Sequence, residues 1–127
     1  MARLSIRIDL DHDGRLGPGK VLLLERIAQH GSISAAGRSL KMSYRRAWEL
    51  VAAVNGSFRE PLVSAQMGGR HGGGASLTPL GTALVEHYRA IEREATDAVE
   101  PRLRALQEAA GALGGSVVAI NGNEHFD

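Results

Sequence analysis

The feature that most constrains this sequence is a pair of short amphipathic segments separated by about three residues. The first segment, residues 32–40, has serines available as an N-cap and predicts a helix with one buried face, formed by Ile33, Ala36 and Leu40. Ser43 is then a candidate N-cap for a second helix, which runs from Tyr44 to about Phe58. Two helices joined by so short a turn have the spacing of a helix-turn-helix.

The second segment has two different faces. At about 100° per residue its apolar side chains fall on one side, which consists of Ala47, Leu50, Val51, Val54 and Phe58. The opposite side begins with Arg45 and Arg46 and continues through Glu49 and two alanines. Small side chains behind paired cations allow a helix to lie close to the floor of a DNA groove, so this segment is predicted to be a recognition helix.

The residues before this pair predict a strand, a turn and a helix. Apolar and polar side chains alternate over residues 4–10, as in a strand with one buried face. Turn residues follow at 11–14 and 17–19, and Pro18 suits the first turn of a helix. That helix ends at Gly31, which readily adopts the left-handed conformation, and its apolar stripe consists of Val21, Leu24, Ile27 and Ala28.

The residues after the pair predict a β-hairpin, here called the wing, and then a long helix. Strand-like residues 62–67 and 75–77 flank a glycine-rich loop that carries Arg70 and His71 at its centre. We expect the tip to touch the DNA backbone, and a flexible linker is the alternative. Thr78 and Pro79 read as the N-cap and first residue of a helix that runs toward Val99. Pro101 must kink or restart that helix, and a further helical piece carries Leu103, Leu106 and Leu113.

The expected fold class is mainly α with a small β wing, a winged helix-turn-helix followed by a long C-terminal dimerisation helix. Residues 1–78 form the predicted DNA-binding region, residues 79–115 a helical dimerisation segment and residues 116–127 a tail. The long helix carries more apolar surface than one small domain needs to cover it, which predicts a homodimer. The residues concerned are Leu84, Val85, Tyr88, Ile91, Val99, Leu103 and Leu106.

Charge is distributed unevenly along the chain. Residues 38–70 contain six Arg or Lys against two Asp or Glu, whereas residues 86–108 contain four against six. A basic middle followed by an acidic helix suits one face that binds DNA and one that does not. A solvated surface of mixed charge is the alternative reading.

Several classes of site are not supported by the sequence. Cysteine is absent, and no apolar run approaches the ~20 residues of a membrane span, so we expect a cytoplasmic protein without disulfides or membrane contacts. Five scattered histidines form no HExxH motif, and no serine lies in a nucleophile motif with an assignable base. We therefore expect no enzyme activity, no metal site and no cofactor.

Two motifs and two aromatic residues have competing interpretations. Residues 9–14 resemble the start of a calcium loop, but Lys20 stands at the twelfth position, where a Glu is needed, so an Asp/Gly turn is favoured. The glycines of residues 68–74 lack the Lys and Ser or Thr of a phosphate loop. Trp48 is read as core packing rather than a base contact, while Tyr44 could bury its ring and still reach a phosphate or base.

Three stretches together resemble the N-terminal domain of the ModE family of molybdate-responsive regulators. They are residues 31–34, residues 42–48 with the sequence Met-Ser-Tyr-Arg-Arg-Ala-Trp, and the glycine-rich wing that ends in Leu77-Thr78. The resemblance covers roughly residues 18–92 and implies a LysR-like winged helix and a homodimer joined through long helices. With the outward position of Glu49, it indicates the expected DNA-binding residues, which are Ser43, Tyr44, Arg45, Arg46, Glu49, Arg70 and His71.

The sequence departs from the family pattern after the long helix. Full-length members continue into small β-barrel domains that bind molybdate, whereas only about 12 residues follow Gly115 here. We therefore expect a sequence-specific DNA-binding transcription regulator that acts alone or with a separate effector-binding protein, and molybdate sensing does not transfer. The alternative is a protein-interaction module on a winged-helix scaffold, which would bind DNA weakly and with little dependence on salt.

Overall fold

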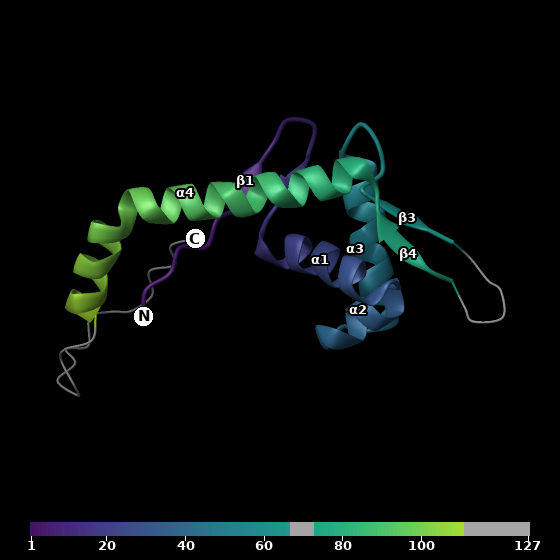
Figure 1. Cartoon of the computed structure of the whole chain (residues 1–127), viewed down its shortest axis with the longest axis horizontal. Coiled ribbons are helices and arrows are strands. Elements are labelled where there is room, and N and C mark those ends of the chain that lie inside the picture. Colours follow the sequence, from purple (N-terminus) through teal and green to yellow (C-terminus); the bar gives the residue numbers. More distant parts are fainter. Residues whose placement is uncertain (67–72, 111–127) are drawn as a thin grey trace, which may run out of the picture.

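The computed structural model describes residues 1–66 and 73–110, and within these ranges the chain forms four helices and four short strands. The helices are α1 (Pro18–His30), α2 (Ile33–Ser39), α3 (Tyr44–Ser57) and α4 (Pro79–Ala110). The strands are β1 (Ile8–Asp9), β2 (Arg15–Leu16), β3 (Val63–Ala65) and β4 (Ala75–Leu77). Figure 1 shows α1, α2 and α3 gathered near one end of α4, with the β3–β4 hairpin projecting beside them. The expected class, mainly α with a small β wing, is confirmed.

Local signals in the sequence determine the ends of the first three helices. Gly31 has a φ of 76°, the left-handed conformation, and ends α1. The Ser32 hydroxyl accepts a hydrogen bond from the Ala35 N–H at 3.0 Å and caps α2. The Ser43 hydroxyl accepts one from the Arg46 N–H at 3.0 Å and caps α3. Because each hydroxyl satisfies a backbone donor that has no partner within its helix, the predicted caps are confirmed.

The main core lies between α1, α2, α3 and the base of the wing. Its buried side chains are Leu23, Leu24, Ile27, Ile33, Ala36, Ala47, Val51, Val54, Leu62 and Val63. The stripe predicted for α1 needs one correction, because Ala28 is exposed whereas Leu23 is buried. Helix α1 contacts α2, α3, α4 and β4. Its buried face is therefore wider than the predicted stripe and is centred on a different side of the helix.

The predicted strand over residues 4–10 is largely wrong in extent. Leu4, Ile6 and Ile8 are indeed half-buried and alternate with exposed neighbours, but only Ile8–Asp9 pairs with another strand. Its partner, Arg15–Leu16, was not predicted as a strand. Ahead of this short hairpin the segment is held to α4, because the Tyr88 hydroxyl donates a hydrogen bond to the Ile6 carbonyl. The burial alternation is therefore produced by packing on a helix rather than by a sheet.

The wing is a short antiparallel hairpin with a well-defined base. Val63 pairs with Leu77 and Ala65 with Ala75, and a further bond from the Gln66 N–H to the Gly74 carbonyl (2.8 Å) extends the pairing. The first strand is shorter than the predicted 62–67. The tip, with Arg70 and His71, lies outside the described residues.

Helix α4 is one continuous helix of 32 residues that contains Pro101. The Thr78 hydroxyl accepts a hydrogen bond from the Gly81 N–H at 3.0 Å, which confirms the predicted cap. Figure 1 shows that α4 extends far beyond the other helices and bends before its yellow-green C-terminal turns. A proline inside a helix removes one hydrogen bond and displaces the preceding turn, so a kink rather than a restart is the outcome at Pro101. Leu113, residues 111–115 of the predicted dimerisation segment and the predicted tail lie outside the described residues.

Candidate nucleic-acid interface

The turn between α2 and α3 is tight and closely packed. Lys41 has a φ of 60°, and the Met42 N–H donates to the Gly37 carbonyl at 2.9 Å. A Cβ on Gly37 would lie 2.9 Å from the Cβ of Ala47, closer than carbon atoms in contact normally approach. Small residues at both positions therefore allow α2 and α3 to approach each other. The contact is on the buried face of α3, and it holds the helix with the opposite face exposed.

The two faces of α3 are largely those predicted. Ala47, Val51 and Val54 are buried in the core, and Leu50 and Phe58 pack against it while remaining partly exposed. The outer face consists of exposed residues, which are Tyr44, Arg45, Arg46, Glu49, Ala52 and Ala53. The structure thus brings five of the seven expected DNA-binding residues, Ser43, Tyr44, Arg45, Arg46 and Glu49, together in the first two turns of one helix and its cap.

Glu49 lies between the two arginines of this face. Its carboxylate accepts a hydrogen bond from Nε of Arg45 at 3.2 Å, and Nη1 of Arg46 lies 3.9 Å from the other oxygen. All three side chains are more than half exposed, so these ion pairs contribute little to stability. Both guanidinium groups can exchange this carboxylate for another acceptor without loss of the fold.

The wing is attached to α3 through one side-chain amide. Oδ1 of Asn55 accepts hydrogen bonds from the N–H groups of Leu62 (2.8 Å) and Val63 (3.1 Å), and Nδ2 donates to the Val63 carbonyl at 3.1 Å. On the other strand, the Ala75 N–H donates to the Gly31 carbonyl at 2.8 Å. The base of the wing therefore has a fixed position relative to both α3 and the end of α1.

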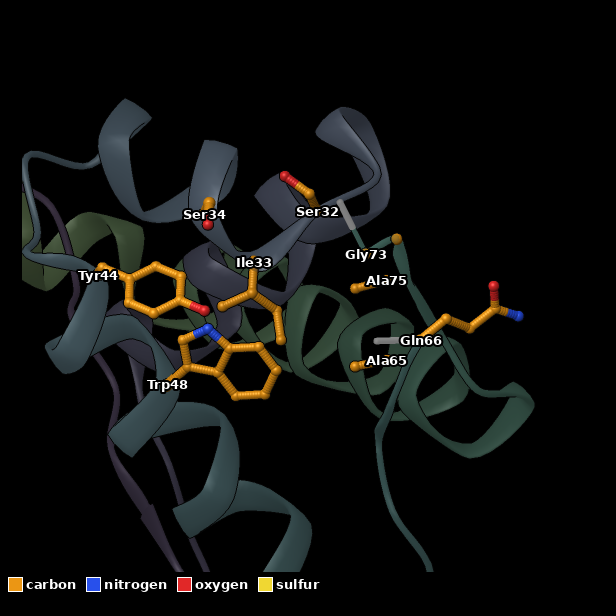
Figure 2. Close-up of a pocket in the computed structure, with 10 residues that line it drawn as sticks. Ser32, Ile33, Ser34, Tyr44, Trp48, Ala65, Gln66, Gly73 and Ala75 are labelled. Carbon is orange, nitrogen blue, oxygen red and sulfur yellow. The ribbon is translucent and has the colours of Figure 1, made fainter. Parts of the chain in front are cut away.

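A cavity of about 140 Å³ lies where α2, α3 and the wing meet. Figure 2 shows that Tyr44 and Trp48 of α3 face Ser34 and Ile33 of α2 across it, with the strand residues on the far side. The indole Nε1 of Trp48 is buried without a hydrogen-bond partner among the described residues. Trp48 packs against the core as predicted, but it also presents this unsatisfied donor beside the cavity.

A second hollow, a shallow groove that is wide open to solvent, lies on the outer face of α3. It is lined by Tyr44, Arg45, Trp48, Glu49 and Ala52, and the exposed surface of its wall is almost entirely apolar. The Tyr44 and Trp48 rings meet edge to face, with centroids 6.1 Å apart and planes at 62°. Tyr44, Trp48 and Ala52 are spaced four residues apart, and residues at this spacing share one face of a helix, so this is the signal in the sequence for the groove.

The other motifs singled out in the sequence do not form sites in the described part of the chain. Residues 11–14 form the turn of the β1–β2 hairpin, where His12 and Asp13 have φ values of 62° and 66°. Within residues 1–66 and 73–110, no group of three or more His, Cys, Asp or Glu side chains could hold a metal ion. No helix in those ranges is both long and apolar enough to cross a membrane.

Comparison with known proteins agrees with this geometry. Residues 20–82 match the family of bacterial regulatory helix-turn-helix proteins of the LysR type. The chain is 40% identical over 105 residues to the molybdenum-pterin-binding protein MopA of Rhodobacter capsulatus, a match that covers 83% of this chain and 36% of that protein. It is 38% identical over 111 residues to the molybdenum transport protein ModE of Azotobacter vinelandii, covering 87% of this chain and 40% of that protein.

A third relative is named for its action on DNA. The chain is 35% identical over 87 residues to the DNA-binding transcriptional dual regulator ModE of Escherichia coli strain K12, covering 68% of this chain and 33% of the relative. The chain thus spans about a third to two fifths of the length of these proteins, none of which bears the name of an enzyme. The resemblance noted in the sequence is confirmed: residues 20–82 form a helix-turn-helix domain of the LysR type, and ModE-type regulators are among the relatives of the chain.

Proposed function

We propose that this chain is a sequence-specific DNA-binding transcription regulator of the ModE type, which binds as a homodimer. In each subunit α3 enters the major groove and the wing contacts the backbone. The observation that carries the proposal is the outer face of α3, where Arg45 and Arg46 lie at the exposed start of a helix supported by α2. A cationic helix start followed by small side chains fits the depth and charge of a DNA groove.

The homodimer is supported by the part of α4 that extends beyond the other helices. Ile91 is 41% exposed and Leu106 is 67% exposed, and both belong to the apolar stripe of α4. Large apolar side chains that recur along one exposed helix favour association with a second apolar surface. A second copy of the same helix supplies such a surface by symmetry and would hold two recognition helices about one DNA turn, ~34 Å, apart.

The names of two relatives suggest the regulatory context. One is called a molybdenum transport protein and another a molybdenum-pterin-binding protein. We extend this to the chain as a proposal of a role in molybdenum homeostasis, with an effector that acts directly or through a separate effector-binding protein.

Selection of bound fragments from a random DNA pool tests the proposed function. We expect an inverted repeat, and we expect binding to weaken with salt by a logarithmic slope of about 0.9 per phosphate contact. Arg45→Ala should relax the preference at one position of each half-site, because a lost bidentate base contact removes about 1–3 kcal/mol of discrimination. Recovery of no common sequence, together with weak binding that salt hardly changes, would instead support a protein-interaction module.

A further inference from the structure

The open groove on the outer face of α3 has an apolar wall between charged borders. Tyr44, which is 63% exposed, lies at one end of the groove and presents an aromatic ring. Ala52 lies at the other end and presents a methyl group. Trp48 lies between them and supports the Tyr44 ring from its edge. Arg45 and Glu49 border the groove and pair with each other, so the charged atoms lie beside an apolar surface.

Most atoms that a base pair presents in the major groove are hydrogen-bond donors or acceptors, and the C5 methyl of thymine is the apolar exception. A polar base edge pressed against the Ala52 methyl and the neighbouring Trp48 ring would lose its water and gain no partner, which is unfavourable. A methyl group in the same place gains from burial instead. We propose that this groove receives the C5 methyl of a thymine in each half-site, and that Ala52 thereby determines specificity.

This inference rests on the proposed DNA-binding function and adds the base that the apolar part of α3 selects. The borders of the groove support it. The pair between Arg45 and Glu49 at the rim is exposed and weak, so the guanidinium can exchange the carboxylate for a neighbouring base or phosphate while the groove takes the methyl. The thymine is therefore expected close to the position whose preference Arg45→Ala relaxes.

Deoxyuridine tests the inference, because it pairs as thymidine does and lacks only the methyl. In the DNA site obtained by selection, each thymine is replaced in turn by deoxyuridine and the dissociation constant is measured with the whole chain. We expect one thymine per half-site at which replacement weakens binding about fourfold, the effect of one buried methyl group. Replacement of thymines outside the half-sites should leave the affinity unchanged.

Two alanine variants form a matched pair for the same measurement. Ala52 and Ala53 are both exposed on α3, but Ala52 lines the groove and Ala53 does not. Ala52→Ser should reduce the preference for thymine over uracil to less than twofold, whereas Ala53→Ser should retain it. Both should melt at similar temperatures, since the substitution costs the same in helix propensity at either position.

The possible failures are distinguishable. If the chain selects a common sequence but binds thymine and uracil versions equally at every position, the inference is wrong and the proposed function stands. The inference is also wrong if Ala52→Ser keeps the full preference for thymine. If no common sequence is selected at all, both the proposed function and the inference fail.

Discussion

Asn55 joins two elements through a single side chain. Its amide forms three hydrogen bonds to the backbone of residues 62 and 63, where the chain passes from α3 into the wing. The amide thus pairs with backbone groups that a neighbouring strand would otherwise pair with. A partly buried amide that satisfies two N–H groups and a carbonyl holds these groups in one arrangement, because each would otherwise lack a partner.

Replacement of this amide should loosen the base of the wing. Asn55→Ala is expected to lower the free energy of unfolding by about 2 kcal/mol, because it leaves partly buried backbone groups unpaired. Asn55→Asp keeps the acceptor for both N–H groups, and when the new carboxyl is protonated its O–H can replace the lost donor to the Val63 carbonyl, so its loss should be smaller at about pH 3. Urea unfolding of the three proteins at that pH measures the order, and equal losses in the two variants would contradict the role assigned to the acceptor oxygen.

Among the helices, the contact between the start of α4 and the wing depends on a glycine. A Cβ at Gly81 would collide with the backbone of Leu62, whose carbonyl also accepts a hydrogen bond from the Thr78 N–H at 2.9 Å. The approach is between main chains, so no side-chain rotation can relieve the collision.

Gly81→Ala is therefore expected to destabilise the protein by about 1–3 kcal/mol, as overpacking does. Gly56 is a useful control, since it lies in α3 and a Cβ there would meet nothing within 4 Å. Gly56→Ala should leave the stability unchanged or raise it by up to about 1 kcal/mol, because alanine is the better helix former. Thermal melts that rank the two variants in the opposite order would show that the close approach is not maintained in solution.

Helices α1 and α4 are joined by an ion-pair network. Arg89 donates two hydrogen bonds to Glu25, at 2.7 and 2.9 Å, and a third to Glu92 at 2.6 Å. The hydrogen bonds from Arg89 lower the pKa of Glu25, against the opposing effect of partial burial, and the same bonds raise the pKa of Arg89. A carboxyl whose pKa is lowered by folding stabilises the folded state above its unfolded pKa and loses this effect as pH falls through the folded value.

The pH dependence of stability should therefore include a term from Glu25. Between roughly pH 5 and pH 3 the free energy of unfolding should fall, and Glu25→Gln should reduce that fall. At pH 7 the same variant should be less stable than the wild type by about 1 kcal/mol. Glu49→Gln removes a carboxylate from an exposed pair and should change stability little. An identical pH profile for Glu25→Gln and the wild type would contradict the role of the network.

Elements were easier to predict than their contacts. The caps at Ser32, Ser43 and Thr78 and the left-handed Gly31 act within a few residues, so sequence spacing was sufficient to find them. The hairpin partner Arg15–Leu16 and the close approach at Gly81 depend on residues that meet only after folding. In the candidate site, the charged residues of α3 were predictable from one helical face, whereas the apolar groove needed the packing of Trp48 beneath Tyr44.

At the scale of the whole molecule, association is the property that the exposed stripe of α4 predicts. We expect a dimer at micromolar concentration, and we expect Leu106→Ser to weaken it at least tenfold by removing a large exposed apolar side chain. Leu10 is 46% exposed and belongs to the β1–β2 hairpin rather than to the stripe of α4, so Leu10→Ser is the matched control. Sedimentation equilibrium measures both constants, and a monomeric wild type would refute the dimer.

Pro101 lies inside α4, which bends in Figure 1, and this has a consequence for the spacing of DNA half-sites. In the proposed dimer, a substitution at this residue would alter the angle between the two subunits and leave every side chain of α3 untouched. The preferred base sequence of each half-site would then depend on the side chains of α3, whereas the preferred spacing between half-sites would depend on Pro101. Insertion or deletion of one base pair lengthens or shortens the gap in a promoter and turns the second half-site by roughly 35° about the duplex. A change at one position of the regulator could then match the new gap.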